Sequence, residues 1–169
     1  MRLKSGKGFG LVELMIVIAI MFVVATIAVP NFNKYRYNNK LKEVARGIAA
    51  DMKFYKQKSM AENADYLLWF GYLDDNTVGI WKCTTSDWSG WKFQFKRKIS
   101  DDGSVRISET PSFYVDYPGV SPFYYRYFIS RKRGTTNNGS FKLRHSKNLS
   151  TATISTNMMG RVSVTYDLK

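Results

Sequence analysis

A single carboxylate interrupts a segment that is long and apolar enough to cross a membrane. The 20 residues from Gly10 to Val29 contain one charged side chain, Glu13. As a helix, this segment spans about 30 Å, the thickness of the bilayer hydrocarbon. A charge at the centre of such a helix costs roughly 2.5–3.5 kcal/mol on insertion scales, and a glutamate near one end costs less. A carboxylate at such an unfavourable position predicts that Glu13 has a function. The simpler alternative is that a glutamate near the membrane surface is tolerated without one.

The residues around Glu13 resemble the processing site of type IV prepilins and pseudopilins. The sequence Gly8-Phe9-Gly10-Leu11-Val12-Glu13 follows a short basic start, although this family usually has Thr or Ser where this chain has Gly10. The resemblance implies that residues 1–8 are a leader peptide and that a membrane prepilin peptidase cuts between Gly8 and Phe9. It also implies that Phe9 is N-methylated, and that Glu13 serves subunit assembly by pairing with the terminal amine of a neighbouring subunit.

An ordinary secretory signal peptide is the competing interpretation of the same residues. It has a basic start, an apolar stretch and small residues before the cut, and Thr26-Ile27-Ala28 is a weak match to such a site. Two observations oppose it, because Glu13 lies inside the apolar stretch and the helical pattern continues beyond Ala28. Under this alternative the chain is a secreted basic protein.

The apolar run ends at Pro30, and the pattern beyond it stays helical. Proline removes one backbone donor and clashes with the preceding turn, and related pilins carry a helix-kinking proline at this place, so Pro30 is predicted to kink the helix. We expect a transmembrane and assembly helix at residues 9–30 and its amphipathic continuation at residues 31–63, ending near Ala61. One apolar stripe marks this continuation, with residues at helical spacing: Leu41, Val44, Ala45, Ile48, Met52 and Tyr55.

From Ala64 onward the pattern is typical of strands, so residues 64–169 are predicted to form a β-rich globular head. The expected fold class is α+β, with the long N-terminal helix packed on this head. The predicted strands are Tyr66–Phe70, Thr77–Cys83, Trp91–Arg97, Val105–Glu109, Phe123–Ile129, Phe141–Arg144, Thr151–Thr156 and Arg161–Tyr166. Turn residues separate these runs, and the proline-bearing stretch from Thr110 to Pro122 is expected to be an irregular loop.

Within that superfamily the head resembles the GspH/FimT group of minor pilins and pseudopilins. The segments that carry this resemblance are Trp88–Phe93, Asn138–Phe141, Ala152–Ile154 and Gly160–Val162. It implies a structural or initiating subunit of a type IV pilus or a type II secretion pseudopilus. Its partners are then other pilin subunits, and it is a single-pass protein of the bacterial inner membrane with its head in the periplasm.

The chain is strongly basic, with a formal net charge of +13, which favours an anionic neighbour such as nucleic acid, lipid or an acidic protein. One basic cluster surrounds Trp91, Phe93 and Phe95, and a second surrounds Tyr124, Tyr125 and Tyr127. The candidate DNA-binding residues are Arg131, Lys132, Arg133, Lys142, Arg144 and Arg161. A pilus-displayed DNA-binding subunit for DNA uptake is therefore an alternative function.

Two observations weigh against DNA binding. In alternating strands the rings face the core and the cations face water, and we favour that interpretation for both clusters. Some members of the resembled group carry a second arginine two residues after the first, a feature linked to DNA binding, and this chain has Ser163 at that place.

The sequence offers no catalytic residues, no metal ligand set and no cofactor motif, so we expect no enzyme. The lone cysteine, Cys83, excludes an intrachain disulfide and is expected to be buried. The lone histidine, His145, is expected at the surface. The acidic stretches Asp74-Asp75-Asn76 and Asp101-Asp102-Gly103 are interpreted as turns in preference to calcium sites.

Overall fold

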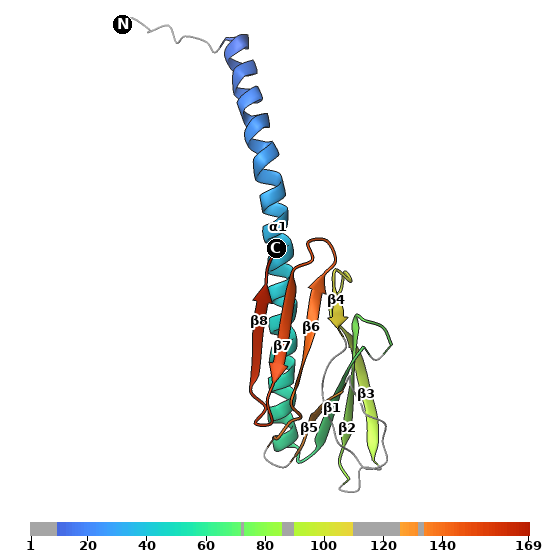
Figure 1. The fold of residues 1–169 in the computed structure, drawn as a ribbon. Helices are drawn as coiled ribbons and strands as arrows, with labels where there is room; N and C mark the ends of the chain where they lie inside the picture. The colour runs from blue at the N-terminus through green and yellow to red at the C-terminus, as the bar shows by residue number, and fades with distance from the viewer. Residues whose placement is uncertain (1–9, 72, 86–89, 110–125, 132–133) are drawn as a thin grey trace, which may run out of the picture. The chain divides into compact units, whose positions relative to one another are not determined.

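The computed structural model describes residues 10–71, 73–85, 90–109, 126–131 and 134–169. The chain divides into two compact units, an N-terminal unit that ends at Arg36 and a head unit that begins at Tyr37. The elements are α1 (Leu11–Ala61), β1 (Asp65–Phe70), β2 (Thr77–Cys83), β3 (Trp91–Lys98), β4 (Val105–Glu109), β5 (Arg126–Ile129), β6 (Gly139–His145), β7 (Thr151–Thr156) and β8 (Val162–Asp167) (Figure 1).

Helix α1 confirms the predicted long helix and continues through Pro30. It ends where the sequence predicts, and Asn63 explains how. Asn63 adopts a left-handed φ of 48°, and the N–H of Ala64 donates to the carbonyl of Ser59 at 3.1 Å. Asparagine is one of the few residues that tolerates this conformation, which satisfies the last carbonyls of the helix and turns the chain into β1.

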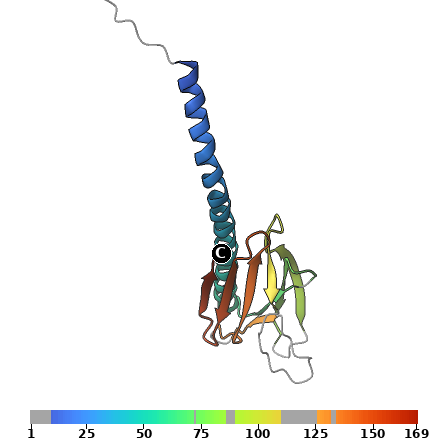
Figure 2. The same ribbon diagram turned by 45° about the horizontal axis from the view of Figure 1, so that its top comes forward.

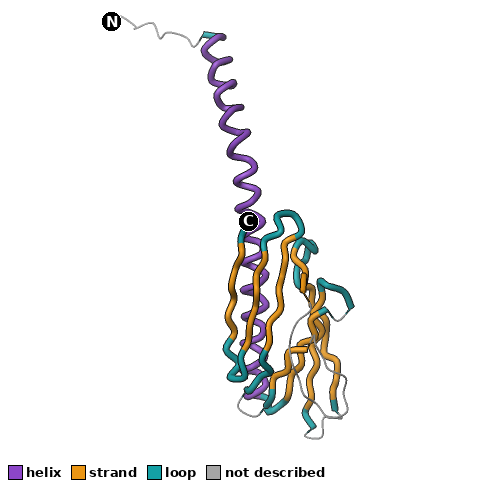
Figure 3. The backbone as a smooth tube through the Cα atoms, in the orientation of Figure 1, coloured by secondary structure: helices purple, strands orange, loops and turns teal. Residues whose placement is uncertain are grey.

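The strands of the head unit form two antiparallel sheets, as Figures 1 and 3 show. Sheet A has the order β3-β2-β1-β5, and sheet B has the order β4-β6-β7-β8. Every predicted strand is present, and β2, β4 and β7 have the predicted bounds. The first three residues of the predicted strand Phe123–Ile129 and the whole predicted loop 110–122 lie outside the described residues.

The second half of α1 packs against the sheets through the predicted stripe. Figures 1 and 2 both show this half running alongside β7 and β8. All six stripe residues are buried, and they share one apolar core with side chains of both sheets. Phe70 of β1 and Phe141 of β6 join the two sheets, with ring centroids 4.4 Å apart. Burial of each large apolar side chain contributes on the order of 1.5–3 kcal/mol, so this stripe is a main source of the head's stability.

Candidate assembly and binding surfaces

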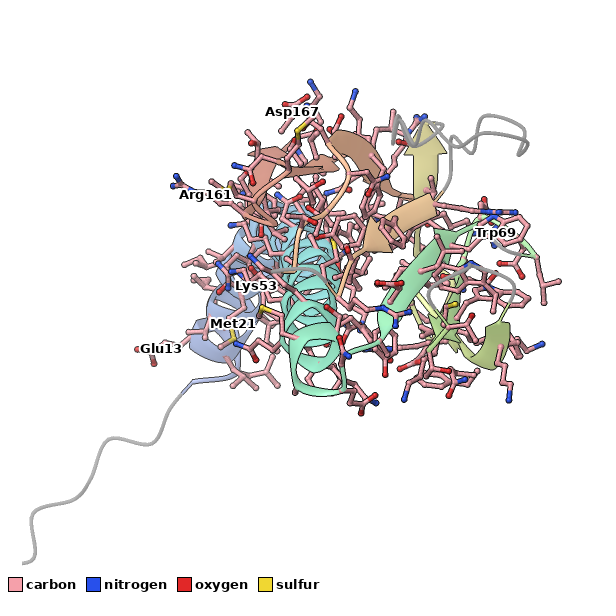
Figure 4. All side chains as sticks on the ribbon, turned by 90° about the horizontal axis from the view of Figure 1, so that it is seen from below. Glu13, Met21, Lys53, Trp69, Arg161 and Asp167 are labelled. Atoms are coloured by element: carbon pink, nitrogen blue, oxygen red, sulfur yellow. The ribbon has the colours of Figure 1, made fainter. Side chains whose placement is uncertain are left out.

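Glu13 lies in the first turn of α1, inside the apolar surface of the N-terminal unit. Within the described residues, one helix is long and apolar enough to span a membrane, and none of its most apolar window is buried inside the chain. The side chain of Glu13 points away from the helix (Figure 4). Gly8 and Phe9, the predicted cleavage and methylation residues, lie outside the described residues.

Thr26 gives a useful contrast with Glu13 in the same segment. Its hydroxyl donates to the carbonyl of Val23 at 2.6 Å, so its polarity is satisfied within the helix. The carboxylate of Glu13 makes no hydrogen bond or ion pair with any residue that the structure describes. Among the described residues, the polarity of Thr26 is therefore satisfied within the helix and that of Glu13 is not, and an unpaired carboxylate is costly in hydrocarbon.

Arg131, a candidate DNA-binding residue, is held by contacts inside the head unit. Its guanidinium donates to one carboxylate oxygen of Asp65 at 3.0 and 3.1 Å, and its backbone N–H donates to the other at 2.6 Å. The guanidinium also donates to the carbonyls of Cys83, Thr84 and Thr85 at 2.6–3.2 Å. The hydrogen bond to Asp65 raises the pKa of Arg131. These contacts join the residue after β5 to the start of β1 and to the end of β2, and they leave little donor capacity for phosphate.

Among the other candidate cations that the structure describes, Arg144 and Arg161 do not lie together. Strand register sets Arg144 of β6 opposite Thr151, and Thr151 opposite Asp167 at the far end of β8 from Arg161. Six residues of strand separate Arg161 from Asp167, or about 20 Å. Lys142 lies on β6, whereas Lys132 and Arg133 lie outside the described residues. DNA binding stays a prediction, and the described residues offer no single basic surface that supports it.

In the first basic cluster the lysines face water as expected, but the rings of Phe93 and Phe95 are not buried in the core. Phe93 and Phe95 of β3 are 43% and 48% exposed, and Lys92, Lys96 and Lys98 are exposed as well. The reason is topological, because β3 is the edge strand of sheet A and is exposed along most of its length. In the second cluster Tyr127 is fully buried, which confirms the expectation there, and Tyr124 and Tyr125 lie outside the described residues.

His145 is buried, so the expectation of a surface histidine is wrong. It is 2% exposed, because β6 directs Phe141, Leu143 and His145 to the same inner face. Its Nδ1 accepts the backbone N–H of Lys147 at 3.2 Å, and its ring lies 4.9 Å from that of Tyr37. Burial lowers the pKa of His145, partly offset by Asp102, and Lys147 lowers it further. Cys83 is buried, as predicted.

We expect acid to weaken the head through His145. Since the folded-state pKa lies below the ordinary value near 6.5, the stabilisation is complete above that value and is lost as the pH falls through the folded pKa. The melting temperature of the head should fall by several degrees between pH 7 and pH 5, measured by circular dichroism. His145→Asn, which keeps an acceptor for the Lys147 N–H, should flatten this dependence. An equal fall of the melting temperature in both proteins would show that His145 does not cause the pH dependence.

The two acidic stretches form turns. Asp74 accepts the backbone N–H of Asn76 at 2.8 Å, and Gly103 takes a left-handed φ of 65°. Hydrogen bonds from Ser100 and Ser104 hold the pKa of Asp102 well below its usual range. Among the described residues, no three His, Cys, Asp or Glu side chains are grouped to hold a metal ion. The carboxylate of Asp102 thus already accepts hydrogen bonds from residues of its own turn.

The structure also shows a contact that sequence patterns missed. Lys56 of α1 lies against the β7–β8 turn, where its Nζ donates to the carbonyl of Met159 at 2.5 Å. Gly160 has a φ of 70°, and a Cβ there would come within 2.8 Å of the Lys56 side chain. Gly160 of the resembled Gly160-Arg161-Val162 segment therefore lets the hairpin approach α1.

Comparison with known proteins places the N-terminal features in a family. A profile described as the prokaryotic N-terminal methylation motif matches residues 3–29. A fimbrial protein of Pseudomonas aeruginosa is 29% identical over 109 residues, which cover 64% of this chain and 70% of the relative. These matches support a type IV pilin or pseudopilin. The type IV major pilin protein PilA of Myxococcus xanthus is 41% identical over 59 residues, covering 35% of this chain and 26% of that pilin.

A solved structure also shares the fold of this chain. The minor pseudopilin EpsH from the type 2 secretion system of Vibrio cholerae matches with a TM-score of 0.53 and 10% sequence identity. The match covers 75% of this chain and 97% of EpsH. It shows that this chain shares the fold of EpsH. The methylation motif and the apolar N-terminal helix suit a membrane-anchored subunit.

Proposed function

We propose that this protein is a minor pilin or pseudopilin that helps to initiate or build a type IV pilus or a type II secretion pseudopilus. The supporting observation is that a prepilin methylation motif and a two-sheet head with the fold of a minor pseudopilin occur in one chain. The apolar first half of α1 anchors the protein in the bacterial inner membrane, with the head in the periplasm. Assembly then buries this helix among the helices of other subunits.

Processing is the first test of this proposal. Gly8 has no side chain, so a peptidase can approach the backbone closely. We expect mass spectrometry to show a mature chain that begins at N-methylated Phe9, and to show the unprocessed chain in cells without prepilin peptidase. A terminus at Val29 would favour the signal-peptide alternative, and an intact Met1 in cells that contain the peptidase would also contradict the proposal.

Stoichiometry tests the minor role separately. Quantitative mass spectrometry of purified fibres should find this subunit far below the major subunit in amount, while its deletion should reduce the number of fibres. Parity with the major subunit would instead make this chain a shaft component.

A further inference from the structure

Among the residues that the structure describes, no strand pairs with the outer edge of β3 from Gln94 to Lys98. This eight-residue strand pairs with β2 on one side and ends sheet A on the other. From Gln94 to Lys98, its backbone makes no other hydrogen bond with a residue that the structure describes. Such a row of unsatisfied donors and acceptors is a template for another strand.

The two faces of this edge differ in chemistry. Register places Phe95 beside Ile80 and Leu68, so Phe95 lies on the face of sheet A that packs toward α1. Lys96 and Lys98 alternate with it and lie on the opposite face. From Phe95 to Lys98 the edge therefore presents Phe95 and Arg97 on the side toward α1, and Lys96 and Lys98 on the side away from it. Phe93 lies on that second side, where its ring centroid is 5.0 Å from that of Trp81.

A groove continues the side of this edge that carries Phe95. It has a volume of about 340 Å³, lies between α1 and sheet A, and has Ile48, Leu68 and Ile80 among its apolar lining residues. Phe54 of α1, which is 54% exposed, and Phe95 both line it. The ion pair between Arg97 and Asp51 joins β3 to α1 within the groove, so the charge of Arg97 is already paired.

We propose that the β3 edge binds an extended segment of another protein in which apolar and acidic residues alternate. Added as a further strand, this segment would direct its apolar side chains toward α1, beside Phe95 and Phe54. Its acidic side chains would point to the other face, beside Lys96 and Lys98. The binding mode is addition of a strand to a sheet, with specificity set by charge on one face and by an apolar groove on the other.

The charge of the edge also argues against a second copy of this chain as the occupant. Two β3 strands that met edge to edge would bring several lysines close to one another, and like charges on neighbouring strands are destabilising. Lysines on an edge are a common protection against such self-pairing. The same lysines favour an acidic strand, so the partner is a different protein segment. This inference goes beyond the proposed function, because it requires no particular fibre.

The test uses the full-length chain in detergent micelles and a fluorescein-labelled octapeptide of alternating Glu and Val. We expect saturable binding by fluorescence anisotropy. A peptide of the same composition with four Glu followed by four Val should bind at least about tenfold more weakly, because its side chains cannot sort onto the two faces. N-methylation of every second residue, in one of the two possible registers, should abolish binding, because it removes the donors that face β3.

Variants locate the site. Lys96→Glu with Lys98→Glu should weaken binding of the Glu-Val peptide by about tenfold or more and should create binding of a Lys-Val peptide. Arg144→Glu with Arg161→Glu makes the same charge change on sheet B and should leave binding unchanged. Phe95→Ala should also weaken binding. Near-ultraviolet circular dichroism verifies that each variant is folded.

Three results would overturn the proposal. The first is equal binding of the alternating, block and N-methylated peptides, which would show a charge effect without strand addition. The second is equal loss of binding in the β3 variant and the sheet B variant. The third is that the alternating peptide does not bind, whereas a single-stranded oligothymidine binds the parent chain and does not bind the β3 variant. This result would make the β3 edge a nucleic-acid surface.

Discussion

Met52→Asp is expected to unfold the head at ordinary temperature. Met52 is fully buried in the core that α1 shares with both sheets. Loss of a large apolar side chain from a core costs about 2–5 kcal/mol, and an unpaired buried carboxylate adds several more. Since domains are stable by about 5–15 kcal/mol, this single change removes most or all of the stability. Near-ultraviolet circular dichroism of the full-length chain in detergent micelles reports the loss of tertiary packing.

Two matched substitutions on the same helix make this prediction specific. Ala50 is exposed, so Ala50→Asp should change the melting temperature little. Ile48 is buried but lines the groove beside sheet A, so an aspartate there has a route to water and should have an intermediate effect. A cooperative near-native transition in Met52→Asp would show that the stripe does not support the head.

The elements predicted best from the sequence are those that a pattern of neighbouring residues defines. The helical stripe and the alternation within β7 are periods that a few neighbouring residues define, and tertiary packing confirmed them. The end of α1 was predicted equally well, because the pattern changes from helical to alternating at Asn63 and Ala64.

The features that sequence could not predict depend on which strands become neighbours. Arg131 belongs to a basic run in the sequence, yet it pairs with Asp65, 66 positions away. The lysines of β3 become an edge surface only because the sheet order ends there. Contacts of this kind are set by topology. The sequence positions of the basic residues therefore do not tell which of them make contacts within the head and which face solvent.

The burial of His145 is a different case, because its signal was present in the sequence. Phe141, Leu143 and His145 alternate, and the first two are core residues, so strand parity already placed the histidine inward. The prediction of a surface histidine gave more weight to the neighbouring charged residues, Arg144 and Lys147, than to the alternation of the strand.

Glu13→Ala is expected to leave membrane insertion intact and to prevent incorporation into the fibre. Alanine removes the unfavourable insertion of a carboxylate, so the chain should enter the membrane at least as well as the parent. In the assembled state we expect Glu13 to pair with the Phe9 amine of a neighbouring subunit. Removal of one partner from such a buried pair costs roughly 3–5 kcal/mol, because the amine is left unpaired in hydrocarbon. Membrane fractionation followed by quantification of the subunit in sheared fibres measures both steps.

The control for this prediction comes from the same helix. Thr26→Ala removes a polar group whose hydrogen bond to Val23 is internal, so incorporation should stay near the parental level. Glu13 could instead act only within its own chain, since an acidic residue in the first turn stabilises a helix through its dipole by about 0.3–1 kcal/mol. That effect is too small to abolish assembly. Normal incorporation of Glu13→Ala would therefore assign Glu13 to this local role, whereas loss of incorporation with intact insertion places its partner in another subunit.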